Sequence, residues 1–440
     1  MVTGSNYLLE SKGEKILIDC GLRQGSNYSE RQNFEPFPYN PKEISAVVVT
    51  HPHVDHIGRL PKLYKDGFRG KVYSTIPAKD FAQILLLDSE HILMQDADKF
   101  KIPNLYGIRE VEELMGGHWE GIEYHEPTKI GNYQVTFYNA GHVLGSSFVL
   151  IEVEGKKLVF SGDLGNSPAP IIGSREALPE EADYCIMEST YGGRIHEPFE
   201  ERKGLLEDAI EDTVKTGGTL MIPAFAMERT QQLLFEINEL MENGRIPQIP
   251  IFLDSPLAIK LTEVYKKHFK YFEESIQKII RSGDAIFNFP GLKKTLTTEE
   301  SKSINKVPSP KVIIAGAGMS NAGRILHHEQ RYLPDPNSLL LIVGYQAVGS
   351  LGRQILEGVK KVTIFGEKVP VNCRVKAIGG YSAHADQPQL LEWLKPAQEY
   401  LKKVFLIHGE IEEMTPLSQK IKDDFAINVE IPAEGQSFEL

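Results

Sequence analysis

One six-residue motif, His51-Pro-His53-Val-Asp55-His56, constrains this chain more than any other stretch. It follows an apolar run at 44–50 that is rich in β-branched residues and predicts a buried strand, and the apolar spacing over 57–63 predicts a helix. The motif therefore lies on a loop between a strand and a helix. Its imidazoles and carboxylate are suitable ligands for zinc or a similar divalent ion. Two imidazoles can face one ion while Asp55 and His56 face a second; the alternative is a solvated polar loop with unrelated histidines.

Length and composition allow more than one domain. The chain has 440 residues, of which 41% are hydrophobic, enough for two domains or three with buried cores. No basic leader precedes a short apolar stretch and no apolar run is long enough to span a bilayer, so a cytoplasmic protein without membrane association is expected. Cys20, Cys185 and Cys373 are far apart and odd in number, and we expect all of them to be reduced core thiols.

The formal net charge of −12 argues against broad electrostatic adhesion to nucleic acid, which depends on Lys and Arg. It does not exclude a nuclease. Two bound divalent cations add about four positive charges at the site itself, where they dominate the local field. Acidic metal ligands make the formal net charge more negative, although the site that they form with the cations attracts phosphate.

Further polar residues follow later apolar runs. Asp19, His142, Asp163 and Glu188 each lie at or just beyond the end of a predicted strand, whereas His91 fits the helical periodicity of 80–100 and is left outside the site. Loops over a rigid sheet are the usual location of an active site. The strands concerned are predicted within 7–19, which forms a hairpin, and within 133–138, 148–160 and 184–188.

From residue 198 helices and strands alternate, which predicts a mostly parallel, doubly wound sheet with its own core. Residues 287–310, rich in Lys, Ser, Thr and Pro, are predicted to be a surface excursion. The predicted helices are 200–216, 227–241, 257–280, 322–332 and 350–356, and the predicted strands are 219–223, 249–254, 311–315 and 339–343.

After about residue 372 short strands resume, and with them polar residues in the style of the first part. His384 precedes a predicted helix, and His408 follows a strand and stands before a glycine. The last segment is therefore expected to return to the first domain. The predicted domains are 1–197 with 373–440, and an insertion domain at 198–372.

Together these residues resemble the motifs of the metallo-β-lactamase superfamily and, within it, of the β-CASP nucleases. The H-x-H-x-D-H motif alone indicates only the superfamily, which includes lactamases, thioesterases and glyoxalase-type hydrolases. Glu188, His384 and His408, separated by an α/β insertion, narrow the resemblance to β-CASP, and all seven family motifs are present in order. The resemblance implies an α/β fold, a metallo-β-lactamase αββα sandwich with an inserted Rossmann-like β-CASP domain.

The resemblance also implies two Zn²⁺ ions per chain. Three protein ligands per ion and a shared carboxylate leave a position open for water, as a catalytic zinc requires. Two ions about 3.5 to 4 Å apart lower the pKa of a bridging water, and the expected reaction is in-line attack of hydroxide on a phosphodiester, leaving a 5′-phosphate and a 3′-hydroxyl. The expected ligands are His51, His53 and His142 for the first ion, Asp55, His56 and His408 for the second, and Asp163 between them.

The departing oxygen needs a proton, and a histidine oriented by a carboxylate is a suitable donor. His384 with Glu188 fits this description and resembles the family's motif pair; the alternative is a structural histidine at a helix start. The predicted catalytic residues are therefore Asp55, Glu188 and His384. Asp19 is expected to orient the ligand loops rather than to touch metal.

Three side chains of the insertion, Arg229, Ser320 and Arg324, are predicted substrate contacts. Helix N-termini with small residues receive phosphates, and arginines pair with them. The alternative is packing and capping of a Rossmann-like sheet.

The predicted function is RNA processing or decay by a zinc-dependent ribonuclease that acts on single-stranded RNA. An endonuclease is expected, and 5′-exonuclease activity and a homodimer are left open. One alternative is a DNA nuclease or a small-molecule metallohydrolase on the same scaffold, although the insertion disfavours a small molecule. The other is a non-catalytic RNA-binding scaffold, which has no need of a complete set of converging ligands.

Overall fold

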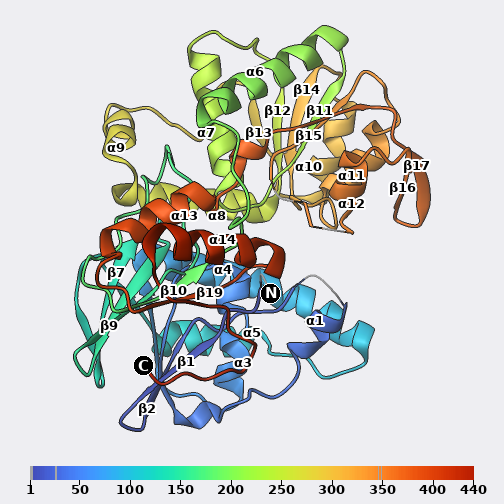
Figure 1. Ribbon diagram of the computed structural model, residues 1–440. Coiled ribbons are helices and arrows are strands. Elements are labelled where there is room, and N and C mark those ends of the chain that lie inside the picture. Colours follow the sequence, from blue (N-terminus) through green and yellow to red (C-terminus); the bar gives the residue numbers. More distant parts are fainter. Residues whose placement is uncertain (1–2, 25–26, 345, 348) are drawn as a thin grey trace. The chain divides into compact units, whose positions relative to one another are not determined.

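The computed structural model describes residues 3–24, 27–344, 346–347 and 349–440, and it divides into two compact units (Figure 1). The first unit comprises residues 1–195 and 384–440, and the second comprises residues 196–383. Each unit is described below by itself. Among the helices in the described ranges, none is both long and apolar enough to cross a membrane.

The first unit contains two sheets. One sheet has the order β1-β2-β3-β4-β5, and the other has the order β20-β19-β10-β9-β8-β7-β6. The strands are β1 (Tyr7–Ser11), β2 (Glu14–Ile18), β3 (Ile44–Val48), β4 (Lys71–Thr75), β5 (Trp119–Ile122), β6 (Thr128–Ile130), β7 (Tyr133–Asn139), β8 (Ser147–Val153), β9 (Lys156–Phe160), β10 (Tyr184–Glu188), β19 (Lys403–Ile407) and β20 (Val429–Glu430). The helices are α1 (Asn27–Gln32), α2 (Val54–Ile57), α3 (Leu60–Lys65), α4 (Ile76–Phe100), α5 (Ile108–Glu113), α13 (Gln387–Leu394) and α14 (Ile411–Phe425).

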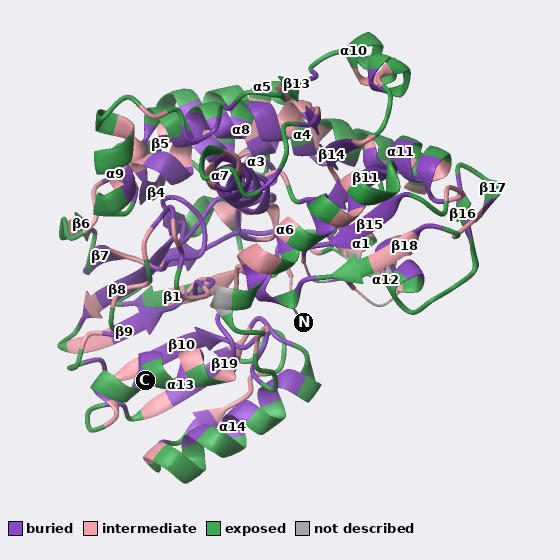
Figure 2. Ribbon diagram, turned by 90° about the horizontal axis from the view of Figure 1, so that it is seen from above, coloured by how far each residue is buried: buried purple, intermediate pink, exposed green. Residues whose placement is uncertain are grey.

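Alternation along the strands produces three apolar layers. In β2, Ile16 and Ile18 join a core with residues of β7 and β8, whereas Leu17 faces a second core with residues of α3 and α4. In β10, Met187 faces a third core with residues of α13 and α14. Successive side chains of a strand point to opposite faces, so each sheet packs on the other sheet and on helices. Figure 2 shows the result as largely buried strands and an α14 with buried and exposed faces. The predicted αββα sandwich is confirmed.

The second unit is built on one parallel sheet with the order β13-β12-β14-β11-β15-β18. Its strands are β11 (Thr219–Pro223), β12 (Ile251–Asp254), β13 (Leu292–Lys294), β14 (Lys311–Ala315), β15 (Leu339–Ile342) and β18 (Arg374–Ala377), and β16 (Lys361–Ile364) and β17 (Glu367–Pro370) form a separate hairpin. The helices are α6 (Phe199–Thr216), α7 (Arg229–Glu242), α8 (Pro256–Lys267), α9 (Glu274–Arg281), α10 (Thr298–Ser303), α11 (Ile325–Tyr332) and α12 (Leu351–Leu356). Alternation of helices and parallel strands gives the Rossmann-like architecture that was predicted.

The single long helix predicted over 257–280 is wrong, because the structure divides it into α8 and α9. Between them Phe272 is buried, and its ring centroid lies 6.2 Å from that of Tyr265 and 6.3 Å from that of Phe287. Tertiary packing of this ring therefore overrides the helical periodicity of the sequence.

The insertion also differs from its prediction at one edge. Residues 287–310 are not only a surface excursion, because they contain β13, which pairs with β12, and α10. At the far edge β18 pairs with β15, so residues 374–377 extend the sheet of the second unit. The structure accordingly divides the chain after 195 and after 383, where the sequence places the divisions after 197 and after 372.

Candidate metal centre

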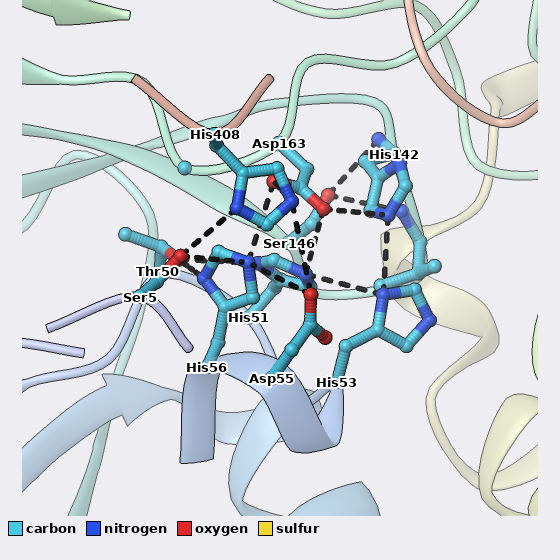
Figure 3. Close-up of polar contacts among 12 residues, drawn as sticks. Ser5, Thr50, His51, His53, Asp55, His56, His142, Ser146, Asp163 and His408 are labelled. Atoms are coloured by element: carbon cyan, nitrogen blue, oxygen red, sulfur yellow. Dashed lines mark hydrogen bonds and ion pairs between the residues drawn. The ribbon is translucent and has the colours of Figure 1, made fainter. Parts of the chain in front are cut away.

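Loops at the carboxyl ends of several strands bring the predicted ligands together (Figure 3). The loop after β3 carries the His51 to His56 motif. Because α2 begins at Val54, Asp55 and His56 lie in its first turn, whereas His51 and His53 precede it. His142 follows β7, Asp163 follows β9 and His408 follows β19 directly. Residues far apart in sequence thus meet at one edge.

Two residues of this edge have an unusual backbone conformation. Asp19 has φ = 58° and His408 has φ = 49°, in the left-handed region that residues other than glycine rarely adopt. Each costs on the order of 1 kcal/mol or more, and such strain persists only where the surroundings impose it. Both residues directly follow a strand, so the left-handed turn redirects their side chains into the centre.

Close backbone packing holds the motif helix in place. A Cβ on Gly21 would lie 1.5 Å from the carbonyl oxygen of Asp55, so this position requires glycine. Next to it, the Cys20 N–H donates to the His56 carbonyl at 2.7 Å, and the Leu22 N–H donates to the Val54 carbonyl at 2.9 Å. The loop after β2 is therefore fixed against α2.

The first group of converging atoms consists of three imidazoles and one carboxylate oxygen. His53 Nδ1 lies 3.2 Å from His51 Nε2 and 3.2 Å from His142 Nε2. The Asp163 Oδ2 atom lies 3.3 Å from His51 Nε2 and 3.5 Å from His142 Nε2. A tetrahedral ion with ligand bonds of about 2.0–2.1 Å places its ligand atoms about 3.3 Å apart, so this group fits zinc.

The second group contains Asp55, His56 and His408 and faces the other oxygen of Asp163. Asp163 Oδ1 lies 3.4 Å from His56 Nε2 and 3.5 Å from His408 Nε2. The Asp55 Oδ2 atom lies 3.8 Å from His56 Nε2 and 3.7 Å from His408 Nε2. One carboxylate therefore presents one oxygen to each group.

Asp163 has the environment of a metal ligand. Its side chain is 2% exposed and Oδ1 has no hydrogen-bond partner among the described residues. A buried carboxylate oxygen without a partner is costly, and a cation at this position would remove the cost. Both donor groups and this oxygen therefore fit a divalent metal.

Protonation states of the first group are consistent with that fit. Burial lowers the pKa of His51 and His142 well below their usual value and lowers the pKa of His53 to about 4. These imidazoles are therefore neutral at pH 7, as metal ligands must be. Burial alone would raise the pKa of Asp163, but the surrounding histidines outweigh it and hold that pKa well below its usual value.

The second group differs in the protonation of His56. Burial opposes a charge on this imidazole, but Asp163, Asp19 and Asp55 outweigh it and raise its pKa well above its usual value. The ring must therefore lose a proton when it binds metal.

Hydroxyl and carboxylate groups orient the ligands through contacts with the ring nitrogens that face away from the centre. Asp19 accepts hydrogen bonds from the N–H of Thr50 at 2.8 Å and from its hydroxyl at 2.8 Å, and its Oδ2 lies 2.7 Å from His56 Nδ1. The Thr50 hydroxyl also lies 3.1 Å from His51 Nδ1. The other ring nitrogen of both histidines is thereby left to face the centre.

Sequence reasoning missed Thr50 and Ser5. The Ser5 hydroxyl lies 3.0 Å from His408 Nδ1, a contact across 403 positions of the chain. The sequence signal was only that each is a hydroxyl residue beside a strand, and this signal is too common to be specific.

His384 and Glu188 lie beside the first group. His384 Nδ1 is 3.2 Å from Glu188 Oε1, and its Nε2 is 4.0 Å from Asp163 Oδ2. Glu188 is fully buried and also accepts hydrogen bonds from the N–H groups of Leu164 at 2.6 Å and Thr190 at 3.2 Å. Burial opposes a charge on His384, but Glu188 and Asp163 outweigh it and raise the pKa of this imidazole to about 9.

The three predicted substrate contacts lie in the second unit and engage residues of that unit. Arg229 is buried and donates to Gln232, and the Ser320 hydroxyl donates to Glu329. The Arg324 guanidinium forms an ion pair with Asp254 at 2.7 Å and donates to the carbonyls of Thr295 and Leu296.

Comparisons with known families agree with this arrangement. A metallo-β-lactamase superfamily model matches residues 2–215, a β-CASP domain model matches residues 230–355, and a model described as a Zn-dependent metallo-hydrolase RNA specificity domain matches residues 368–432. Among solved structures, a protein of unknown function from Enterococcus faecalis V583 matches 99% of this chain and 96% of its own with a TM-score of 0.56. Its sequence is 13% identical, so it supports the fold alone.

Curated relatives cover nearly the whole chain. A ribonuclease of Thermus thermophilus is 41% identical over 95% of this chain and 93% of its own length. An RNase J-like protein of Methanocaldococcus jannaschii is 30% identical over 97% and 94%, and the transcription termination factor FttA of Methanosarcina mazei is 31% identical over 95% and 66%. The Thermus thermophilus and Methanocaldococcus jannaschii relatives match over nearly their full lengths, and the three family models follow one another along the chain. The chain therefore belongs to the β-CASP ribonuclease family of the metallo-β-lactamase superfamily.

Proposed function

We propose that the protein is a two-zinc ribonuclease that hydrolyses phosphodiester bonds of single-stranded RNA. The observation that carries the proposal is the position of Asp163, whose two oxygens face two separate groups of ligand atoms. A single metal would need only one of these groups. RNA is the proposed substrate because curated relatives are named ribonuclease and RNase J-like protein.

The proposed ligands are those of the two groups. His51, His53 and His142 would hold one ion, Asp55, His56 and His408 would hold the other, and Asp163 would join both. When bound, a pair of such ions supplies an activated water nucleophile and neutralises charge on the phosphate. The protein orients the ligands through Asp19, Thr50 and Ser5.

His384 is the proposed proton donor. Since Glu188 only accepts hydrogen bonds, the Nδ1–H of His384 donates to it, and a ring with a raised pKa carries a second proton on Nε2. As hydroxide forms the new bond to phosphorus and the bond to the 3′ oxygen breaks, that proton passes from His384 Nε2 to the departing oxygen. The products are a 5′-phosphate and a 3′-hydroxyl.

Oligonucleotides labelled at either end test the substrate and the mode of cleavage. RNA and DNA of one sequence are compared, each with a 5′-hydroxyl or a 5′-phosphate. We expect cleavage of unpaired RNA to fragments with 5′-phosphates, at internal positions and whichever 5′ end is present. Preference for DNA would contradict the proposed substrate, and cleavage only from a 5′-phosphate end would contradict the endonuclease mode.

The change Ser5→Ala tests how His408 is positioned. Loss of the hydrogen bond to Nδ1 frees the ring to rotate, so affinity for the second ion should fall by about 10- to 100-fold, as for other partners of metal ligands. Competition with a chromophoric chelator measures both affinities. Ser11→Ala is the matched control, because Ser11 ends β1 and its hydroxyl donates to Glu154. Unchanged metal affinity in Ser5→Ala would show that Ser5 does not position His408.

A further inference from the structure

A second concentration of unusual residues lies at the carboxyl edge of the parallel sheet in the second unit. The neighbouring strands β14, β11 and β15 end at Ala315, Pro223 and Ile342. In open α/β sheets, ligands bind to the loops that follow the carboxyl ends of the strands. The loop after β11 lies between the loops of its two neighbours, and it carries Phe225.

Phe225 is exposed although its backbone is fixed. The side chain is 40% exposed. Its carbonyl accepts hydrogen bonds from the N–H of Thr230 at 3.3 Å and from the Thr230 hydroxyl at 2.7 Å, and the preceding Ala224 N–H donates to the Ala315 carbonyl at 3.0 Å. An exposed aromatic ring whose backbone is held by hydrogen bonds is preorganised for contact with a ligand.

Glycines of both neighbouring loops lie against the ring. A Cβ on Gly318 would lie 2.6 Å from Phe225 Cδ2, so any larger residue there would displace the ring, and a Cβ on Gly344 would lie 3.6 Å from Cε2. The Gln346 amide donates to the Gly318 carbonyl at 2.9 Å and to the Gly344 carbonyl at 3.3 Å, which ties the two loops together. Two described positions of these loops that lie against the ring therefore carry no side chain.

We propose that Phe225 is a stacking platform for an unpaired base of single-stranded RNA. Single-stranded RNA presents flat, unstacked bases, and aromatic side chains bind them in a sequence-tolerant way. One ring flanked by glycine backbone matches the face of one base. A docking protein is not proposed, because a stable protein interface needs a contact surface of about 800 Å² on each partner. The inference rests on the proposed function, since RNA is there the substrate, and it assigns a binding residue outside the metal centre.

Kinetics of the metal-loaded protein provide the first test. In Phe225→Ala, we expect KM for a single-stranded RNA to rise by about 5- to 150-fold, the range for loss of one stacked base, with little change in kcat. Phe225→Tyr should retain the wild-type KM, because it keeps the ring. Phe365→Ala is the matched control: Phe365 belongs to the same unit, is 55% exposed and stacks on His327 at a centroid distance of 4.6 Å. It should leave KM unchanged.

A scan with single abasic sites locates the stacked base. Fluorescence anisotropy measures binding of RNAs that each lack one base, in the presence of chelator so that no cleavage intervenes. The wild-type protein should bind one of these RNAs more weakly than the intact RNA, namely the RNA that lacks the stacked base. Phe225→Ala should bind that RNA and the intact RNA equally well, because the two changes remove the same contact. Equal RNA affinity of Phe225→Ala and wild type, or an unchanged abasic profile, would overturn the inference. Binding that depends on Phe225 without any cleavage would uphold the platform and contradict the proposed function.

Discussion

Replacing Asp163 with alanine is expected to remove bound metal and RNA cleavage together. The change eliminates both oxygens that link the two ligand groups, so each group loses its only shared anion. Activity should fall by at least about 10³-fold, which corresponds to ~4 kcal/mol of transition-state stabilisation. Elemental analysis of the purified variant should find much less than two ions per chain.

The variant should nevertheless fold, because Oδ1, one of the two oxygens that it loses, has no hydrogen-bond partner among the described residues. Added zinc should raise the melting temperature of wild type, since a ligand that binds only the folded state stabilises it, and should not do so for Asp163→Ala. Asp183→Ala is the control, because Asp183 pairs with Lys402 at 2.8 Å and accepts a hydrogen bond from the Lys157 N–H at 2.8 Å. Full metal content in Asp163→Ala would contradict the bridging role.

Replacing His384 with alanine is expected to leave the metals in place and to slow the chemical step. Loss of a general acid lowers kcat by about 10²- to 10⁴-fold, whereas KM should change little. His384 lies outside both groups proposed to hold the ions, and its Nδ1 faces Glu188. His91→Ala is the control, because His91 is exposed on α4 and contacts Gln95. Loss of metal in His384→Ala would contradict the assignment.

A substrate with sulfur in place of the departing 3′ oxygen isolates the proton transfer. A thiolate departs without protonation, since its conjugate acid has a pKa of about 8.5. His384→Ala should therefore cleave this RNA nearly as fast as wild type does, while it cleaves ordinary RNA slowly. An equal loss of rate on both substrates would show that His384 does not donate the proton.

The sequence was most informative for short strands with a clearly bounded apolar run. The strands 184–188 and 219–223 were predicted with the bounds that β10 and β11 have in the structure, because a run of apolar residues bounded by polar ones has few alternatives. The residues proposed as ligands were identified by their chemical types, which a solvated loop does not require. Their convergence around Asp163 follows from the order of the strands.

The missed features depend on contacts that no local pattern records. Ser5 and His408 are 403 positions apart, and a serine beside a strand has many ordinary roles. The break between α8 and α9 follows the burial of Phe272, which a helical periodicity does not reveal. The edge strand β18 was excluded from the insertion because its short, polar sequence resembles the strands of the first unit, yet it pairs with β15.

Zinc titration of metal-free protein tests the central claim most directly. RNA cleavage should be absent without metal, should rise with added zinc and should reach its plateau at about two equivalents per chain, as a two-metal site requires. The fragments should carry 5′-phosphates at every point of the titration. Full cleavage of RNA by the metal-free protein, or a plateau at one equivalent, would contradict the account.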